Sequence, residues 1–210
     1  MAIELRVYLP LPDLGRQFAA YLGSPLRARG YPPVEGDHAL IVEVAPGLAI
    51  ERIIDLALKS VPDVEPGIHF VERQFGVLEV HAQDAALVDK AGQAILEGIG
   101  ATAEDTLRPT ISYIDVIEDV TDQHAVIVNR NREASMLLPG QTLLVVEVVP
   151  ALFAAVAANA AERVSPEATL VTVSMIGAAG RVYLAGATAD IVRARDEIAR
   201  VLGEVAGREQ

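Results

Sequence analysis

The chain has 210 residues, of which 51% are hydrophobic, and it carries a net charge of −12 at pH 7. This length fits one large or two small domains and is sufficient to bury a core. The absence of cysteine excludes a disulfide framework, cysteine-ligated zinc and thiol chemistry. Because this acidic chain has no cluster of lysine and arginine, we expect no nucleic-acid partner.

The sequence also argues against a membrane protein. No apolar run approaches the roughly 18 residues that a membrane helix needs. The N-terminus has neither the basic region nor the apolar region of a signal peptide. We therefore expect no membrane segment and a location in the bacterial cytoplasm.

The first half of the chain predicts short strands and helices, separated by prolines and glycines. Alternating apolar residues favour strands, and apolar residues at helical spacing favour amphipathic helices. Asp13 is expected to cap the first helix, and Asp84 to open the last. The predicted elements are a strand over 3–9, a helix over 13–22, a loop over 27–36, a strand over 38–44, a helix over 48–58, strands over 68–73 and 77–81, and a helix over 84–100.

The second half repeats the first after a shift of 104 residues. The identical pairs include Gly36 and Gly140, Leu40 and Leu144, Glu43 and Glu147, Pro46 and Pro150, Ala57 and Ala161, Pro62 and Pro166, Gly76 and Gly180, and Val88 and Val192. A strand over 110–117, a helix over 122–128 and a loop over 129–132 begin the second copy, whose later helix covers 152–164. We predict two duplicated domains, residues 1–104 and 105–210, each an α/β (α+β) unit with helices covering an antiparallel or mixed sheet.

The sequence has no constellation of catalytic residues. His69, His81 and Glu79 could meet on facing strands and bind a metal, but polar residues on a half-exposed strand explain them more simply. Gly177–Arg181 is a turn of small residues that could hold an anion, but no helix begins there. No nucleophile elbow, phosphate loop or dinucleotide fingerprint is present. We predict no enzyme activity, no catalytic residue, no metal and no cofactor.

The turn Glu72, Arg73, Gln74, Phe75 and Gly76 is the most distinctive stretch. An adjacent acid and base here could be a surface ion pair of little energy. However, the second half has Ile176, Gly177 and Ala178 at the equivalent place, so the fold does not need the charges.

Lys59 and its copy Arg163 lie at helix C-termini, where a cation usually interacts with the helix dipole. That explanation covers both positions. It leaves open a further role at an edge between molecules.

These residues together resemble a known family, the tandem-domain shell proteins of bacterial microcompartments. The resemblance is strongest to the circularly permuted kind whose trimers stack face to face, as in carboxysome shells with a gated pore. Similarity covers the whole chain and is carried by the segments 43–50, 55–59, 71–76, 128–132, 138–140 and 176–181.

The resemblance implies a structural protein made of two permuted shell domains, with ferredoxin-like sheets covered by helices. Three chains would form a pseudohexameric ring, two rings could stack, and the rings would tile with hexameric and pentameric shell proteins. Glu72 and Arg73 match gate residues of a central pore that passes small metabolites. The turns 74–76 and 176–178 would border this pore, whereas Lys59 and, less closely, Arg163 match residues at the tile edge. The compartment could be a carboxysome or a catabolic one.

An alternative hypothesis is a tandem regulatory module that binds a small molecule between its halves. Such a module would show a saturable ligand site and no two-dimensional assembly. An enzyme is the third hypothesis, and the absence of a catalytic constellation argues against it.

Overall fold

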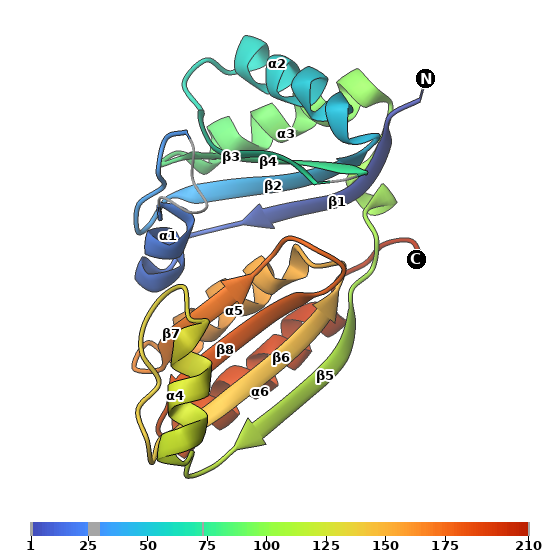
Figure 1. The fold of residues 1–210 in the computed structure, drawn as a ribbon. Coiled ribbons are helices and arrows are strands. Elements are labelled where there is room, and N and C mark those ends of the chain that lie inside the picture. The colour runs from blue at the N-terminus through green and yellow to red at the C-terminus, as the bar shows by residue number, and fades with distance from the viewer. Residues whose placement is uncertain (1, 25–29, 73, 210) are drawn as a thin grey trace. The chain divides into compact units, whose positions relative to one another are not determined.

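The computed structural model describes residues 2–24, 30–72 and 74–209, with the backbone alone for residue 72. By its contacts the chain divides into two compact units, Met1–Arg108 with Ala206–Gln210, and Pro109–Val205. Each unit contains a four-stranded sheet with helices packed on it (Figure 1). The predicted α/β class is confirmed. The division into duplicated domains at residue 104, which rests on sequence, stays a prediction.

The sheet of the first unit is antiparallel, with the strand order β1-β2-β4-β3. The predicted order of strands and helices is confirmed. The elements are β1 (Glu4–Leu11), α1 (Arg16–Leu22), β2 (His38–Ala45), the short 3-10 helix η1 (Gly47–Ala49), α2 (Ile50–Ser60), β3 (Glu65–Glu72), β4 (Phe75–Ala82), α3 (Ala85–Ile99) and the 3-10 helix η2 (Ala103–Asp105).

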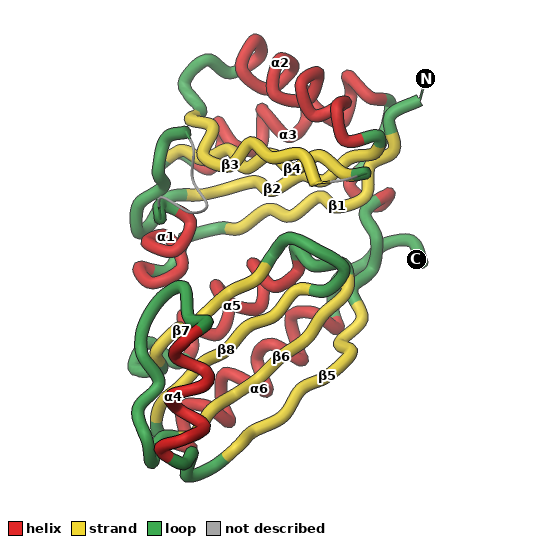
Figure 2. Tube along the Cα trace, in the orientation of Figure 1, coloured by secondary structure: helices red, strands yellow, loops and turns green. Residues whose placement is uncertain are grey.

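The second unit repeats this plan, with the strand order β5-β6-β8-β7. In Figures 1 and 2, α4 crosses one face of the sheet, while α5 and α6 cover the opposite face. The elements are β5 (Thr110–Ile117), α4 (Asp122–Arg130), β6 (Thr142–Val149), α5 (Phe153–Val164), β7 (Thr169–Ser174), β8 (Gly180–Gly186) and α6 (Thr188–Gly203).

The main core of the first unit lies between its sheet and the helices α2 and α3 (Figure 1). The buried side chains of Leu78 and Val80 on β4 pack there against Ile53 of α2 and Ile95 of α3. The side chain of Asp84 accepts a hydrogen bond from the Ala86 N–H at 2.9 Å and caps α3 as expected. The apolar periodicity that predicted α2 and α3 therefore marks their buried faces.

The expected cap on the first helix is wrong. The helix α1 begins at Arg16, its N-cap residue is Gly15, and no side chain caps it. Asp13 instead adopts a positive φ of 53°, and the next residue, Leu14, exchanges backbone hydrogen bonds with Gly36 and Asp37. Aspartate tolerates this left-handed conformation better than most residues, so Asp13 serves the turn and not the helix.

The duplication extends to irregular backbone features, with one change of spacing. The positive-φ residue Asp13 corresponds to Asp119, 106 residues later, whereas Gly36 corresponds to Gly140, 104 residues later. The segment between these points is therefore two residues shorter in the second unit. For this reason a single shift of 104 aligns the chain only from Gly36 onward.

The C-terminal residues return to the first unit. The backbone of Arg208 donates to the Thr106 carbonyl at 2.9 Å and accepts from the Arg108 N–H at 2.8 Å. The Arg208 guanidinium also pairs with Glu4 on β1. None of the described helices has the length and apolar character needed to cross a lipid bilayer.

Candidate functional site

The distinctive turn lies at the tip of the β3–β4 hairpin. Glu72 pairs with Phe75 in the strand register, and Gln74 lies in the turn that leads into β4. Gln74 is exposed there. Arg73 and the side chain of Glu72 lie outside the described residues, and their role as a gate stays a prediction.

An ion pair anchors the base of this tip. Arg6 on β1 donates through Nε to Oε1 of Glu43 on β2 at 2.9 Å, and both side chains are largely buried. The same guanidinium lies over the ring of Phe75, with its Cζ 3.7 Å from the ring centroid. Burial raises the pKa of Glu43, whereas the hydrogen bond and charge of Arg6 oppose this rise. Arg6 therefore connects the central sheet to the tip.

The tip also packs closely against the turn that follows β2. A Cβ atom on Gly76 would lie 2.2 Å from the carbonyl oxygen of Gly47 and 2.6 Å from Cβ of Ile50. Gly76 has no positive φ, so glycine is needed here for close approach and not for an unusual conformation. Beside this contact lies a hollow of about 830 Å³, bordered by Arg6, Gln74 and Phe75.

The second unit has a different tip at the equivalent place. Ile176, Gly177 and Ala178 lie in a bend between β7 and β8, and Gly177 has a φ of 129°. Gly177 and Ala178 are exposed, and Ile176 is half-buried. No charged side chain occurs among these three residues. Whether either tip borders a pore stays a prediction.

The glutamate of the central strand has another partner in this unit. Glu147, the copy of Glu43, accepts a hydrogen bond from Nε of Arg181 on β8 at 2.8 Å. Arg181 belongs to the turn considered for anion binding. Because its guanidinium is already paired with a carboxylate, that turn has no unpaired cation to offer an anion.

The two candidate edge residues lie where the sequence places them, in the last turns of α2 and α5. Nζ of Lys59 lies 2.9 Å from Oδ1 of Asp55, and the Lys59 side chain is 76% exposed. Arg163 is close enough to Glu197 on α6 to lower the pKa of that carboxyl, although Arg200 has the larger effect. Both cations remain candidates for contacts between molecules.

The three residues considered for a metal site do not converge. His69 approaches Glu51 on α2 at 3.3 Å, whereas Glu79 and His81 point to the opposite face of the sheet. There the carboxylate of Glu79 lies 3.0 Å from Nδ1 of His81, and both side chains are buried. The described part of the chain contains no group of three ligands that could hold a metal ion.

The pKa values of this buried pair move in the same direction. Burial raises the pKa of Glu79. Burial by itself lowers the pKa of His81, but the hydrogen bond and charge of Glu79 outweigh it and raise that pKa. The pair therefore binds a proton more tightly than two exposed side chains would.

The roles of Arg6 and Glu43 were not predicted from the sequence. A charged residue inside the apolar strand 39–45 signals that a partner is needed, because an unpaired buried carboxylate is costly. The sequence does not say which strand supplies the partner.

Comparison with known proteins gives consistent matches along the chain. Residues 5–105 match the family model of the CsoS1D N-terminal domain. The chain is 40% identical over 209 residues to the carboxysome shell protein CcmP of Synechococcus elongatus, covering 100% of this chain and 96% of that protein. It is 38% identical over 204 residues to the carboxysome shell protein CsoS1D of Prochlorococcus marinus subsp. pastoris, covering 97% and 78% of the two chains.

Two solved structures share the whole fold. A double-ringed trimeric shell protein of the RMM microcompartment is 62% identical, with a TM-score of 0.95, covering 99% of this chain and 100% of that one. A fused permuted hexameric shell protein of the same microcompartment is 41% identical, with a TM-score of 0.92, covering 98% and 100%.

Proposed function

Because the chain belongs to the family of tandem-domain, permuted shell proteins of bacterial microcompartments, we propose that three chains form a pseudohexameric ring with a central gated pore. Its place is then in the microcompartment shell, beside hexameric and pentameric shell proteins. The observation that carries the proposal is the full-length similarity to a double-ringed trimeric shell protein at 62% identity. The role is structural, and we propose no catalytic activity for it.

The gate is assigned to the first tip, residues 72–76. Three Arg73 side chains around a threefold axis repel one another unless each meets a carboxylate, and Glu72 is the adjacent acid. Opposite charges about 4 Å apart gain ~1 kcal/mol in water and ~4 kcal/mol at an effective dielectric of 20. A ring of such pairs is therefore only modestly favoured over solvated side chains, and ligands or salt can shift the balance.

The surroundings of the tip support a gate that changes shape. Gln74 and Phe75 border the hollow of about 830 Å³, which gives their side chains room to move. Below them, Arg6 and the close contact at Gly76 hold the base of the hairpin. A base held in this way supports a gate that opens without unfolding of the sheet.

The experiment is cryo-electron microscopy of the assembled protein and of the double variant Glu72→Ala/Arg73→Ala. We expect discs with a central hole, and in the variant an open pore within an intact ring. The control Ala178→Ser changes the second tip and should leave the pore as in the wild type. A variant pore that is still sealed would place the gate elsewhere, and single chains without rings would contradict the shell assembly itself.

Two rings are proposed to stack through exposed apolar residues of α4 and of the segment that follows it: Val126, Met136 and Leu138. These side chains are 53%, 49% and 52% exposed. Asn129 fixes the segment after α4 against the helix, since its side chain bonds both backbone groups of Leu137, at 2.7 and 2.9 Å. Exposed apolar residues that are held in place are typical of protein contacts.

Light scattering with mass determination tests the stacking. We expect a mass of six chains for the wild type and of three for Val126→Lys/Leu138→Lys. The matched control Gln123→Lys, on the same helix, should keep six. A three-chain mass for the wild type would argue against stacking and would leave the ring intact.

A further inference from the structure

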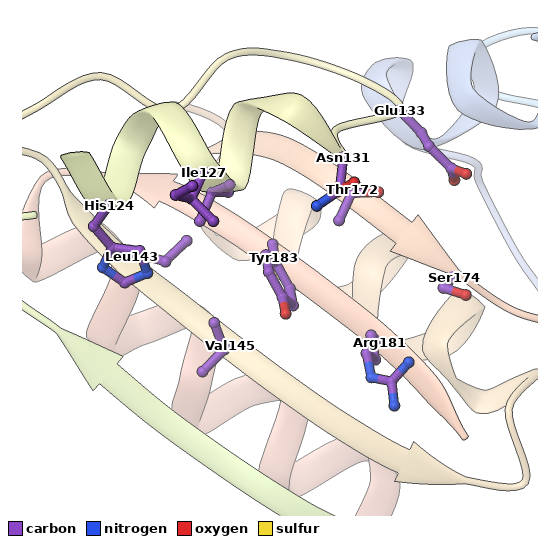
Figure 3. Close-up of a pocket in the computed structure, with 11 residues that line it drawn as sticks. His124, Ile127, Asn131, Glu133, Leu143, Val145, Thr172, Ser174, Arg181 and Tyr183 are labelled. Carbon is purple, nitrogen blue, oxygen red and sulfur yellow. The ribbon is translucent and has the colours of Figure 1, made fainter. Parts of the chain in front are cut away.

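The second unit contains a hollow of about 440 Å³ between α4 and the sheet (Figure 3). Leu143 and Val145 of β6 form an apolar floor, and Ile127 of α4 lies over it. Tyr183 stands in the middle, and His124 lies toward one end. The volume is within the range of sites that bind small molecules, roughly 300–1,000 Å³.

The equivalent helix of the first unit, α1, carries aromatic side chains at the places of two residues that line this hollow. Counting 106 residues back, His124 corresponds to Phe18 and Ile127 to Tyr21. Phe18 and Tyr21 are 0% and 2% exposed, and their rings stack with centroids 6.2 Å apart. α1 therefore carries buried aromatic rings at the places where α4 carries His124 and Ile127 beside the hollow.

Polar groups of the hollow are available to a ligand. The hydroxyl groups of Tyr183, Thr172 and Ser174 and the side-chain amide of Asn131 line it. None of these side chains makes a hydrogen bond to another residue within the described ranges. Such hydroxyl and amide groups can donate hydrogen bonds to a ligand and accept hydrogen bonds from it in place of water.

The charges around the hollow do not favour an ionic ligand. The one cation among its lining residues with a fixed charge is Arg181, which is already paired with Glu147 at 2.8 Å. Glu133 is the other residue with a formal charge that lines the hollow. An anion would meet a site without net positive charge, and a cation would lose hydration over an apolar floor.

We propose that this hollow is a binding site for a small uncharged molecule that carries a carbonyl or hydroxyl oxygen on a short apolar body. The oxygen meets the hydroxyl group of Tyr183, and the apolar body covers Leu143 and Val145. The site lies within one unit and is separate from the tips. It does not depend on the proposed pore.

The test uses three molecules of nearly equal size and different charge: butanamide, butyrate and butylammonium. Their binding to the assembled protein is measured by ligand-observed NMR titration. We expect saturable binding of butanamide, at least about tenfold tighter than that of either ion, because tenfold corresponds to about 1.4 kcal/mol of unfavourable charge burial. Saturable binding by none of the three, or tighter binding of butyrate, overturns the proposal.

Variants locate the binding. His124→Phe/Ile127→Tyr gives the second unit the aromatic rings of the first and should abolish butanamide binding, whereas Gln123→Phe on the exposed side of α4 should not. Tyr183→Phe removes one hydroxyl group without changing the ring, and should weaken binding about three- to tenfold. Unchanged binding in the filled variant or in Tyr183→Phe overturns the proposal. The mass of each variant is measured in parallel, so that loss of binding is not confused with loss of assembly.

Discussion

The two hairpin tips occupy equivalent places in the two units, yet they differ in the ion pair at their base and in the side chains they carry. In the first unit, Arg6 reaches from the edge strand β1 to Glu43 and also lies over the ring of Phe75. In the second, Glu147 is paired with Arg181, which belongs to the hairpin strand β8 itself. Thus only the first tip is connected through this ion pair to a third strand.

The comparison separates what the fold requires from what one copy has acquired. Both copies need a neutralised glutamate in the central strand, but it can be paired from either neighbouring strand. Both copies also need a glycine at the start of the second hairpin strand, Gly76 or Gly180. The charged residues 72 and 73 occur in one copy only, so they belong to the role of that tip and not to the sheet.

The largest expected effect tests the shared requirement for glycine. A Cβ at Gly76 would lie 2.2 Å from the Gly47 oxygen, and one at Gly180 would lie 2.0 Å from the Ala151 oxygen. Because these neighbours are backbone atoms that cannot rotate away, Gly76→Ala and Gly180→Ala should each lower the free energy of unfolding by about 3 kcal/mol. Urea denaturation monitored by circular dichroism measures the change.

Gly203→Ala is the matched control, since no atom lies within 4 Å of a Cβ there. It should change stability by no more than about 0.5 kcal/mol. A large loss at Gly76 with none at Gly180 would contradict the shared packing.

A second prediction tests the difference between the two ion pairs. The side chains of Arg6 and Glu43 are 22% and 10% exposed, against 51% and 34% for Arg181 and Glu147. Arg6→Ala leaves a buried carboxylate without a partner and should cost about 3 kcal/mol. Arg181→Ala, with its partner in contact with water, should cost under about 1 kcal/mol.

Thermal and urea unfolding measure both losses. Replacing the partner as well, in Arg6→Ala/Glu43→Leu, should recover much of the stability, because no buried charge is then unpaired. Equal losses at Arg6 and Arg181 would show that burial does not distinguish the two pairs.

The same residues show which features of the fold and of the site could be predicted from the sequence. The repeat placed Gly76 on Gly180 and located both tips, because hairpins and amphipathic helices leave periodic patterns. The partner of Glu43 could not be predicted, since strand order, and not sequence distance, brings Arg6 next to it. The hollow under α4 was missed as well, because it depends on which face of a short helix meets the sheet.

The third prediction concerns pH and a pair that only the first unit has. Glu79 and His81 correspond to Tyr183 and Ala185 in the second unit, so the glutamate–histidine pair occurs in the first unit alone at this place. The pKa of His81 is raised from its ordinary value of 6.5, chiefly by Glu79 against the opposing effect of burial. A group with a raised pKa in the folded state stabilises the fold below its ordinary value and loses that contribution as pH rises.

The melting temperature of the wild type should therefore fall between pH 6 and pH 8. In Glu79→Gln this slope should be smaller, because the partner that raises the pKa of His81 is gone. His124→Gln, which changes a histidine of the second unit, serves as the control and should keep the wild-type slope. An identical slope in wild type and Glu79→Gln would assign the pH dependence to other groups.

At Lys59 we expect the smallest change in stability, together with a separate effect on the assembly of sheets. The pair with Asp55 is an exposed i,i+4 contact, so Lys59→Ala should cost only about 0.3–0.5 kcal/mol. If Lys59 lies at the edge between tiles, the same variant should lose extended sheets in electron micrographs while the ring keeps its mass. Arg163→Ala, its less similar counterpart, should reduce sheet formation less, and the exposed Lys90→Ala on α3 should not change it. The stability measurement alone cannot distinguish a residue at the tile edge from any other exposed cation, so the micrographs decide. If sheets persist in Lys59→Ala, Lys59 has no role at the edge and interacts only with the helix dipole and Asp55.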